Sequence, residues 1–329
     1  ITDNSFYDGG KFNSLKASID HAKKLINDGA DIIDIGAESS KPGSDPVSST
    51  DQIRKIEPLV EALRDISNIP ISIDTRSSKV ISHLLKYEIN IVNDISSLED
   101  KGLLDIVKSN RLSISLMHML GTPKTMQMNP IYDNVVDDIY EYLKNRAELC
   151  INHGIDKSNI IIDPGFGFGK TLDHNYKILN NLEKFSNMGY RVLSGISRKS
   201  MIGDVLNKPV TDRLYGSLAA SVIAIKNNTS ILRVHDVRET KRLLAEAGSN
   251  ASVIAKIERA ESLEDDVITE IIQESAGIMV ARGDLGVEIG DPQLPAQQKR
   301  LILLARANDR FSKSKLEENN ENLYTLNSN

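Results

Sequence analysis

This 329-residue chain has little cysteine and no long apolar run. Cys150 is its single cysteine, which excludes an internal disulfide and a cysteine-based metal site and favours a reducing, cytoplasmic location. No run of about 18 apolar residues is present, which argues against a membrane span. No signal peptide is visible, and the chain opens on Ile1 within a loop-like segment. We therefore expect a cytoplasmic protein whose sequence continues upstream of Ile1.

A large excess of one charge is also absent. The formal net charge is −6, and acidic and basic residues are interspersed along the chain. Neither nucleic acid nor an anionic membrane is therefore an expected partner. With 40% hydrophobic and 26% charged residues, the composition is typical of one large globular domain or two small ones. An anionic ligand would have to be held by local cations rather than by the overall field.

A repeated pattern fills residues 12–244, in which a short β-branched run ends in a polar residue and an amphipathic stretch follows. The expected strands are 30–39, 69–75, 89–95, 111–119, 159–165, 190–197 and 230–237. Such apolar strands joined by helical crossovers predict a parallel sheet that is buried on both faces. The fold class is therefore α/β, a (β/α)8 TIM-type barrel that lacks its native first strand, which would lie upstream of Ile1.

Polar residues recur at the end of each expected strand. They are Glu38, Asp74, Asn93, His118, Asp163, Ser197 and His235. In a parallel barrel these ends form one face, where active sites lie. Each residue alone is about as well explained as a cap for the following helix, but the recurrence at every strand favours a site.

Two groups of these residues suggest a ligand. Asp74, Asn93 and Asp163 are acceptors that need a donor pair when buried, and Lys199 is a charged donor. A pterin, with an amide N–H beside an exocyclic amine, supplies such a pair. The alternative is a structural ion pair between Asp163 and Lys199.

The second group is cationic and suits a phosphate or pyrophosphate. Its members are Lys41, Arg198, Arg233 and His235. Solvation at the surface is the alternative for any of these cations.

The glycine-rich run DPGFGFGK (163–170) fits neither common phosphate-binding spacing. Its glycines instead predict a sharp turn out of a barrel strand. Phe166 and Phe168 either wall a pocket or pack in the core. His118, which lies between two methionines, is expected to be a packed residue rather than a metal ligand.

In order, these motifs resemble dihydropteroate synthase over about residues 1–244. The matching runs are TDNSFYDGG (2–10), GAESSKPG (36–43), SIDT (72–75), NDIS (93–96), MHMLGTPKTMQ (117–127), DPGFGFGK (163–170), SRKS (197–200) and RVHDV (233–237). The resemblance implies a transferase of folate biosynthesis. It would condense 6-hydroxymethyl-7,8-dihydropterin diphosphate with p-aminobenzoate, releasing pyrophosphate with the help of Mg²⁺.

The resemblance also implies roles for individual residues. The pterin would be held by Asp74, Asn93, Asp163 and Lys199, of which Asp74 and Lys199 would be catalytic. The pyrophosphate would be held by Thr2, Ser40, Lys41, Arg233 and His235. Ser197 and Phe168 would border the aminobenzoate, beside Lys199. A homodimer is a further expectation.

The sequence departs from the family pattern at three places. The first strand and the Asn that would ligate the metal are expected upstream of Ile1. Lys41 stands where the family usually has Arg, which turns a bidentate contact into a point charge. Leu120 replaces a usual Gln.

After residue 247 the pattern changes. SVIAKIERAESLED (252–265) and AGIMVARGDLGVEIG (276–290) resemble pyruvate kinase, in which the matching Lys256, Glu258 and Asp284 would be site residues. We expect a vestigial fragment over 248–310 and a disordered polar tail over 311–329. One hypothesis places 252–258 in the empty first-strand position of the barrel.

Three functions therefore compete. The first is a synthase formed by the barrel of residues 1–247. The second is an inactive pterin-binding remnant, and the third is phosphotransfer by the appended fragment.

Overall fold

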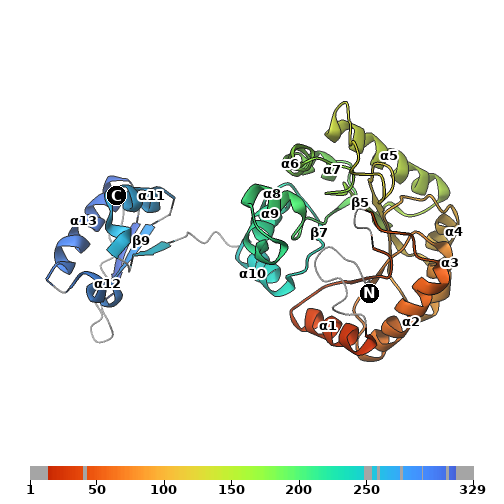
Figure 1. The fold of residues 1–329 in the computed structure, drawn as a ribbon, viewed down its shortest axis with the longest axis horizontal. Coiled ribbons are helices and arrows are strands. Elements are labelled where there is room, and N and C mark those ends of the chain that lie inside the picture. The colour runs from red at the N-terminus through yellow and green to blue at the C-terminus, as the bar shows by residue number, and fades with distance from the viewer. Residues whose placement is uncertain are drawn as a thin grey trace. The chain divides into compact units, whose positions relative to one another are not determined.

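The computed structural model describes residues 14–39, 43–247, 254–257, 260–274, 277–290, 292–308 and 311–315. The chain divides into two compact units, Ile1–Ala247 and Gly248–Asn329 (Figure 1).

The first unit is built on one curled parallel sheet with helices outside it (Figure 1). Its strands are β1 (Ile33–Gly36), β2 (Ile71–Asp74), β3 (Ile91–Asp94), β4 (Ser113–Met117), β5 (Ile160–Asp163), β6 (Arg191–Ser194) and β7 (Ile231–Leu232). They follow one another in sequence order across the sheet, and every neighbouring pair is parallel. Each lies within its expected range, so the TIM-type arrangement with one strand fewer than eight is confirmed for the described residues.

Helices connect the strands. They are α1 (Leu15–Asn27), α2 (Ser49–Ile66), α3 (Ser78–Leu84), α4 (Gly102–Asn110), α5 (Val135–His153), α6 (Leu172–Asn180), α7 (Leu182–Ser186), α8 (Ser200–Leu206), α9 (Leu214–Lys226) and α10 (Val237–Ala247). Short 3-10 turns occupy η1 (Leu85–Tyr87), η2 (Lys157–Asn159) and η3 (Val210–Asp212). The sequence sets these limits locally, as α5 shows. Asn134 accepts hydrogen bonds from the first-turn N–H groups of Val136 and Asp137, and Gly154 ends the helix with a φ of 94°.

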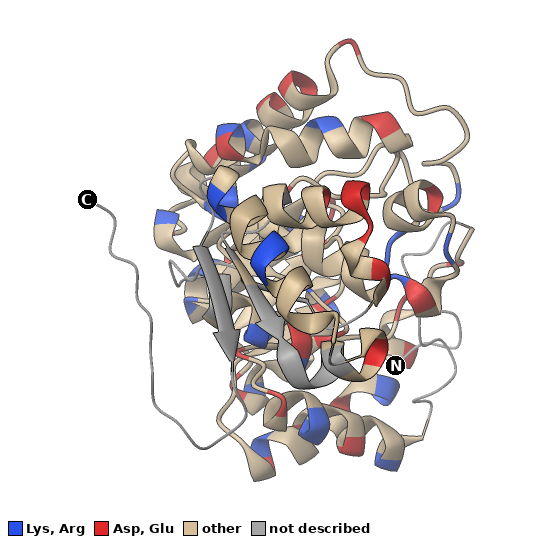
Figure 2. Ribbon diagram, turned by 90° about the vertical axis from the view of Figure 1, so that its left-hand side faces the viewer, with Lys and Arg blue, Asp and Glu red and all other residues tan. Residues whose placement is uncertain are grey.

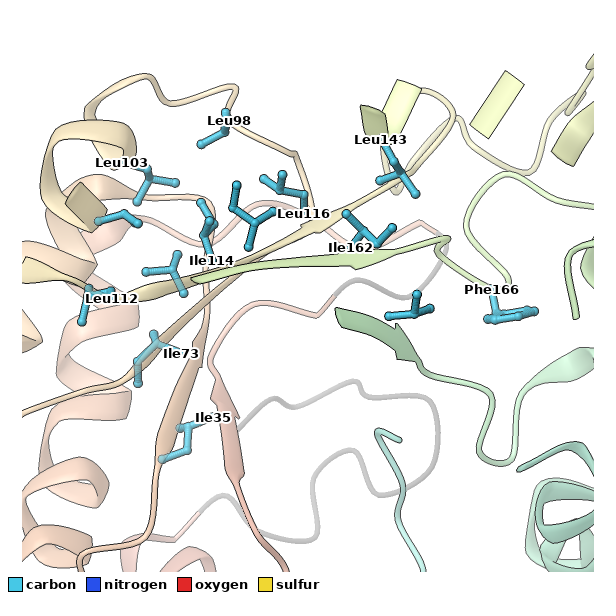
Figure 3. Close-up of a cluster of buried hydrophobic side chains, with 14 of the residues drawn as sticks. Ile35, Ile73, Leu98, Leu103, Leu112, Ile114, Leu116, Leu143, Ile162 and Phe166 are labelled. Atoms are coloured by element: carbon cyan, nitrogen blue, oxygen red, sulfur yellow. The ribbon is translucent and has the colours of Figure 1, made fainter. Parts of the chain in front are cut away.

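Alternation along the strands separates the two faces of the sheet. Ile33, Ile35, Ile73, Ile114 and Ile162 belong to the main hydrophobic core, four of them visible in Figure 3. Intervening positions carry polar side chains, which are Asp34, Ser72, Asp74, Asn93, Ser115 and Asp163. The outer face is therefore packed against helices, while the inner face is polar and available for a site.

The second unit contains a separate three-stranded parallel sheet in the order β10-β9-β8. Its elements are β8 (Ile254–Ile257), η4 (Ala260–Leu263), α11 (Asp265–Glu274), β9 (Gly277–Ala281), α12 (Arg282–Ile289), α13 (Leu294–Ala307) and β10 (Phe311–Lys315). Its own core includes Ile268, Ile272, Ile278 and Leu301.

The hypothesis that residues 252–258 complete the barrel is wrong. β8 pairs with β9, with Ile254 opposite Gly277, and takes no part in the seven-stranded sheet. The physical reason is proximity, because the crossover through α11 brings a strand of the same fragment next to β8.

The expected disorder of the tail is also wrong for its first five residues. Phe311–Lys315 forms β10, which pairs with β9 in parallel. The alternation of Phe311, Lys313 and Lys315 with serine suits an edge strand, where charged side chains are tolerated. Residues 316–329 lie outside the described part of the chain.

Charges of both signs are distributed over the ribbon, as Figure 2 shows. Among the helices that the structure describes, none combines the length and apolarity needed to cross a membrane.

Arg64 ties two loops together below the amino ends of β2 and β3. Its guanidinium donates to the carbonyl oxygens of Ile69 (2.7 Å), Tyr87 (2.8 Å) and Glu88 (2.8 Å), and to Asn90 Oδ1 (2.9 Å). Loss of a cation leaves such carbonyls without their donor.

We predict that Arg64→Met lowers the free energy of unfolding by about 2 kcal/mol or more, because several charge-assisted hydrogen bonds are lost. Urea unfolding at equilibrium measures the change. Arg54→Met on the same helix is the matched control, since Arg54 is exposed and pairs with Asp51 only at the surface. That control should change stability by less than about 0.5 kcal/mol. Equal losses in the two variants would contradict the assignment.

Candidate active site

Strand ends converge on one face of the barrel. Asp74 ends β2 and lies opposite Asn93 of β3, while Asp163 ends β5 opposite Met117. Arg233 follows β7 directly. The parallel register therefore brings together the carboxylates, amide and guanidinium that the sequence places far apart.

A cavity of about 460 Å³ opens inside the barrel between β1 and β7. Its polar wall includes Asp34, Ser72, Asn93, Ser115 and Arg233, and the rest is mostly isoleucine and leucine. Asp74, Asp163 and Lys199 are not part of the wall. The size and lining suit a small, flat, polar-edged ligand.

The amide of Asn93 is oriented by Asp34. Asn93 is 2% exposed, and its Nδ2 donates to Asp34 Oδ2 at 3.0 Å. Among the described residues, Asn93 Oδ1 is a buried atom without a hydrogen-bond partner, as is Ser115 Oγ. Both belong to residues of the cavity wall, so a ligand with donors could satisfy them.

Asp163 is held by Arg233 and by its own turn. Arg233 Nη2 donates to Asp163 Oδ2 at 3.1 Å, and the N–H of Gly165 donates to Oδ1 at 2.8 Å. The cationic partner of Asp163 is thus Arg233, not the Lys199 of the alternative weighed from the sequence. Arg233 Nη1 is buried and unpartnered in the described part of the chain, which leaves one donor for a ligand.

Lys199 lies over the glycine-rich loop. Its Nζ donates to the carbonyl oxygen of Phe166 and stands 4.6 Å from the centre of the Phe168 ring. Burial and the nearby Arg233 lower the pKa of Lys199 to about 7, although Asp163 opposes the change. A proton can therefore leave or join Lys199 near neutral pH.

The pKa of Asp74 is raised, whereas that of Lys199 is lowered. Burial and the Asp34 carboxylate raise the pKa of Asp74 well above its ordinary value, while Arg233 acts to lower it. A donor pair brought by a ligand would favour the ionised form again.

The members of the expected phosphate group have different partners in the structure. His235 Nδ1 lies 3.0 Å from the Oγ of Ser197, a residue predicted to border the aminobenzoate. Arg198 instead donates to both carboxylate oxygens of Asp236 at 2.8 Å, and also to the carbonyl oxygens of Val210 and Thr211. Its guanidinium therefore tethers the loop after β6.

Several predicted residues fall outside what the structure describes. Thr2, Ser40, Lys41 and Glu258 lie beyond the described residues, and for Lys256 in β8 and Asp284 in α12 only the backbone is described. Their roles remain predictions.

His118 is a packed residue, as expected from the sequence. It is 5% exposed, and burial followed by the charge of Lys170 lowers its pKa to about 2. Its ring meets Tyr142 edge-on at 4.9 Å. No group of three or more His, Cys, Asp or Glu side chains able to hold a metal ion occurs among the described residues.

Sequence reasoning missed Asp34, Ser115 and Lys170. Asp34 and Ser115 are single polar residues at alternate positions of β-branched strands, and this period-two pattern was the available signal. Lys170 was treated only as the end of a glycine-rich run, and no local pattern reveals that it is buried.

Comparison with known proteins decides the family. Residues 1–235 match the family described as pterin binding enzyme. The dihydropteroate synthase of Haemophilus influenzae is 43% identical over 244 residues, which cover 74% of this chain and 89% of that protein. The chain belongs to the dihydropteroate synthase family. Members of this family are transferases.

Solved structures of dihydropteroate synthases share its fold. The Yersinia pestis enzyme with a sulfonamide drug has a TM-score of 0.73 and 40% identity, covering 75% of this chain and 90% of that chain. The Xanthomonas albilineans enzyme in complex with 7,8-dihydropteroate has a TM-score of 0.65 and 34% identity, covering 73% and 86%. Residues 219–312 match the barrel domain of pyruvate kinase, so the appended fragment is similar to that family.

The raised pKa of Asp74 has a consequence for stability. A carboxyl whose folded pKa exceeds its unfolded value contributes stability that is present below the unfolded pKa of about 4. That contribution is lost as the pH rises through the folded pKa.

We predict that the free energy of unfolding of the parent chain falls between about pH 5 and about pH 8. In Asp74→Asn, where the side chain cannot ionise, it should fall less. Urea unfolding at the two pH values measures the difference. Asp20→Asn on exposed α1 is the control and should keep the parental pH dependence. A parental dependence in Asp74→Asn would refute the assignment.

Proposed function

We propose that the chain condenses p-aminobenzoate with 6-hydroxymethyl-7,8-dihydropterin diphosphate to give 7,8-dihydropteroate and pyrophosphate. The observation that carries this proposal is the set of unpartnered polar atoms around one cavity: Asn93 Oδ1, Ser115 Oγ and Arg233 Nη1. A pterin has donors for the first two and acceptors for the third. The Xanthomonas albilineans relative binds 7,8-dihydropteroate, which is the product of the proposed reaction.

The reaction is a substitution at the pterin methylene. The aminobenzoate nitrogen forms a bond to that carbon, and the bond from the carbon to the diphosphate oxygen breaks. Pyrophosphate leaves with the electron pair, and the new amine loses a proton. No covalent intermediate with the protein is needed.

Residues at the strand ends would hold the pterin and stabilise the charges. Asp74, in its ionised form, would stabilise positive charge developing on the methylene, since it lies beside the cavity wall. Asn93, Asp163 and Lys199 would orient the ring. Lys199, with a pKa lowered to about 7, also stands 4.6 Å from the centre of the Phe168 ring and could accept or return a proton there.

The leaving group needs cations. We assign this role to Arg233 and His235, together with Thr2, Ser40 and Lys41 from the resemblance. Arg233 would serve both the pterin side and the leaving-group side of the site, because one of its nitrogens binds Asp163 and another is unpartnered. Ser197 and Phe168 would border the aminobenzoate.

Magnesium is the proposed cofactor. Mg²⁺ commonly binds through substrate phosphates and few protein ligands, so the diphosphate would supply most of its contacts. When bound, it would neutralise the diphosphate.

The remaining properties follow from simpler observations. Cys150 is buried and free, which suits the reducing cytoplasm that we propose as the location. Val205, Leu206 and Tyr215, on α8 and α9, are exposed apolar side chains that suit the proposed homodimer. We assign residues 1–247 to the synthase and propose that 248–310 is a remnant without kinase activity, since its described strands number far fewer than a barrel needs.

We predict that Asp74→Ala and Lys199→Ala each lower aminobenzoate-dependent pyrophosphate release by about a hundredfold or more, because each removes charge next to the reacting carbon. Release is measured with both substrates and Mg²⁺ present. Lys177→Met on the outer helix α6 is the control and should keep full activity, because Lys177 is exposed and pairs only with Asp173.

Binding of the pterin diphosphate without any release would favour the remnant over the synthase. ATP formation from phosphoenolpyruvate and ADP would instead support the third function.

A further inference from the structure

Every backbone carbonyl from Phe166 to Gly169 accepts a hydrogen bond from a different side chain. Lys199 donates to Phe166 O, Gln127 to Gly167 O (2.6 Å), Lys170 to Phe168 O (2.9 Å) and Tyr132 to Gly169 O (2.7 Å). Gln127 and Tyr132 come from the segment between β4 and α5, and Lys199 follows β6. A loop of alternating glycines, which would otherwise be free to move, is thus fixed along its whole length.

Lys170 is the buried member of this set. It is 4% exposed, and its Nζ lies 3.1 Å from His118 Nδ1, 3.3 Å from His118 O and 2.9 Å from Phe168 O. Three acceptors match the three donors of the ammonium form, although burial lowers the pKa of Lys170 well below its ordinary value and only the charge of Asp163 opposes this change. With Lys170 as the donor, His118 is neutral with Nδ1 unprotonated, which agrees with the burial that lowers its pKa.

The loop also presses against the segment that contains His118. A Cβ atom on Gly165 would lie 2.0 Å from His118 O, and one on Gly169 would lie 2.7 Å from Leu120 Cβ. Both glycines have positive φ, at 70° and 66°. Lys170 and His118 therefore join two segments whose backbones already touch.

The side chain that this arrangement controls is Phe168. Its ring packs with Ile95, Met117 and Met126, and Lys199 stands 4.6 Å from its centre. The carbonyl of Phe168 is the one that Lys170 holds. A change in that peptide would move the ring relative to Lys199.

We propose that Lys170, held by His118, is a positioning residue for the amine substrate, an aromatic amine of the p-aminobenzoate class. This inference rests on the proposed function. The pterin side of the cavity is formed by Asp34, Asn93, Ser115 and Arg233, which lie on or directly after other strands. Lys170 instead holds the carbonyl of Phe168, and the Phe168 ring lies 4.6 Å from Lys199 Nζ, so its effect falls on the amine.

The test is Lys170→Met, which keeps an unbranched chain and removes all three donations. The KM for p-aminobenzoate should rise about tenfold or more, because small misplacements of a positioning group are costly. The KM for the pterin diphosphate should change by less than about twofold. Lys177→Met is the matched control, exposed on α6, and should leave both constants at the parental value.

A milder variant tests the proposal even if Lys170→Met does not fold. Tyr132→Phe removes only the hydroxyl that donates to Gly169 O and keeps the ring that meets His174 edge-on at 5.1 Å. It should raise the KM for p-aminobenzoate by about twofold to threefold, with the pterin constant unchanged. Folded variants in which both constants rise equally, or neither rises, would overturn the proposal.

Failure of the proposed function would be distinguishable. If the parent chain releases no pyrophosphate, the proposed synthase activity is wrong. The readout is then calorimetric binding of p-aminobenzoate with the pterin diphosphate present. Weaker binding by Lys170→Met than by the parent supports the positioning role. Equal binding, or no binding by the parent, overturns it.

Discussion

The ion pair between Arg233 and Asp163 is the contact on which the candidate site depends. Asp163 is fully buried at the end of β5, where an unpaired carboxylate would be costly. Arg233, which follows β7 two strands away, compensates it at 3.1 Å. The same guanidinium lowers the pKa of Lys199 and acts to lower that of Asp74. One cation thus makes the buried charge tolerable and also acts on the pKa of the two residues proposed to be catalytic, although burial is the larger cause of each shift.

The unpartnered polar atoms of the inner face lower the stability of the fold, and apolar packing on the outer face offsets this loss. Asn93 Oδ1, Ser115 Oγ and Arg233 Nη1 have no partner in the described part of the chain, and each such atom costs about 1–3 kcal/mol. The isoleucines on the opposite face of the same strands pack into the main core. Each strand therefore stabilises the fold with one side and serves the ligand with the other, which is the division expected of a barrel enzyme.

Much of this was predictable from the sequence, because strand ends are marked by a polar residue after a β-branched run. That signal found Asp74, Asn93 and Asp163. It could not find the partners. The pairing of Asp163 with Arg233, and of Lys170 with His118, joins residues far apart in sequence. They meet because their strands lie two places and one place apart in the sheet.

The failed predictions concern the second unit. The hypothesis that residues 252–258 join the barrel rests on the rule that a crossover places consecutive strands side by side, but β8 pairs with β9, the next strand of its own fragment. The expected disorder of 311–315 was argued from polarity, yet an edge strand accepts polar side chains provided that its backbone finds a partner.

The contact of Gly165 and Gly169 with the segment at His118 and Leu120 limits how such a site can evolve. Any side chain at these two positions would displace a neighbouring backbone or Cβ atom, so the path of the loop is not open to gradual change. New preferences for the amine must therefore arise by exchanging the side chains mounted on the loop. The chain can alter what it selects only while the frame that presents those side chains stays as it is.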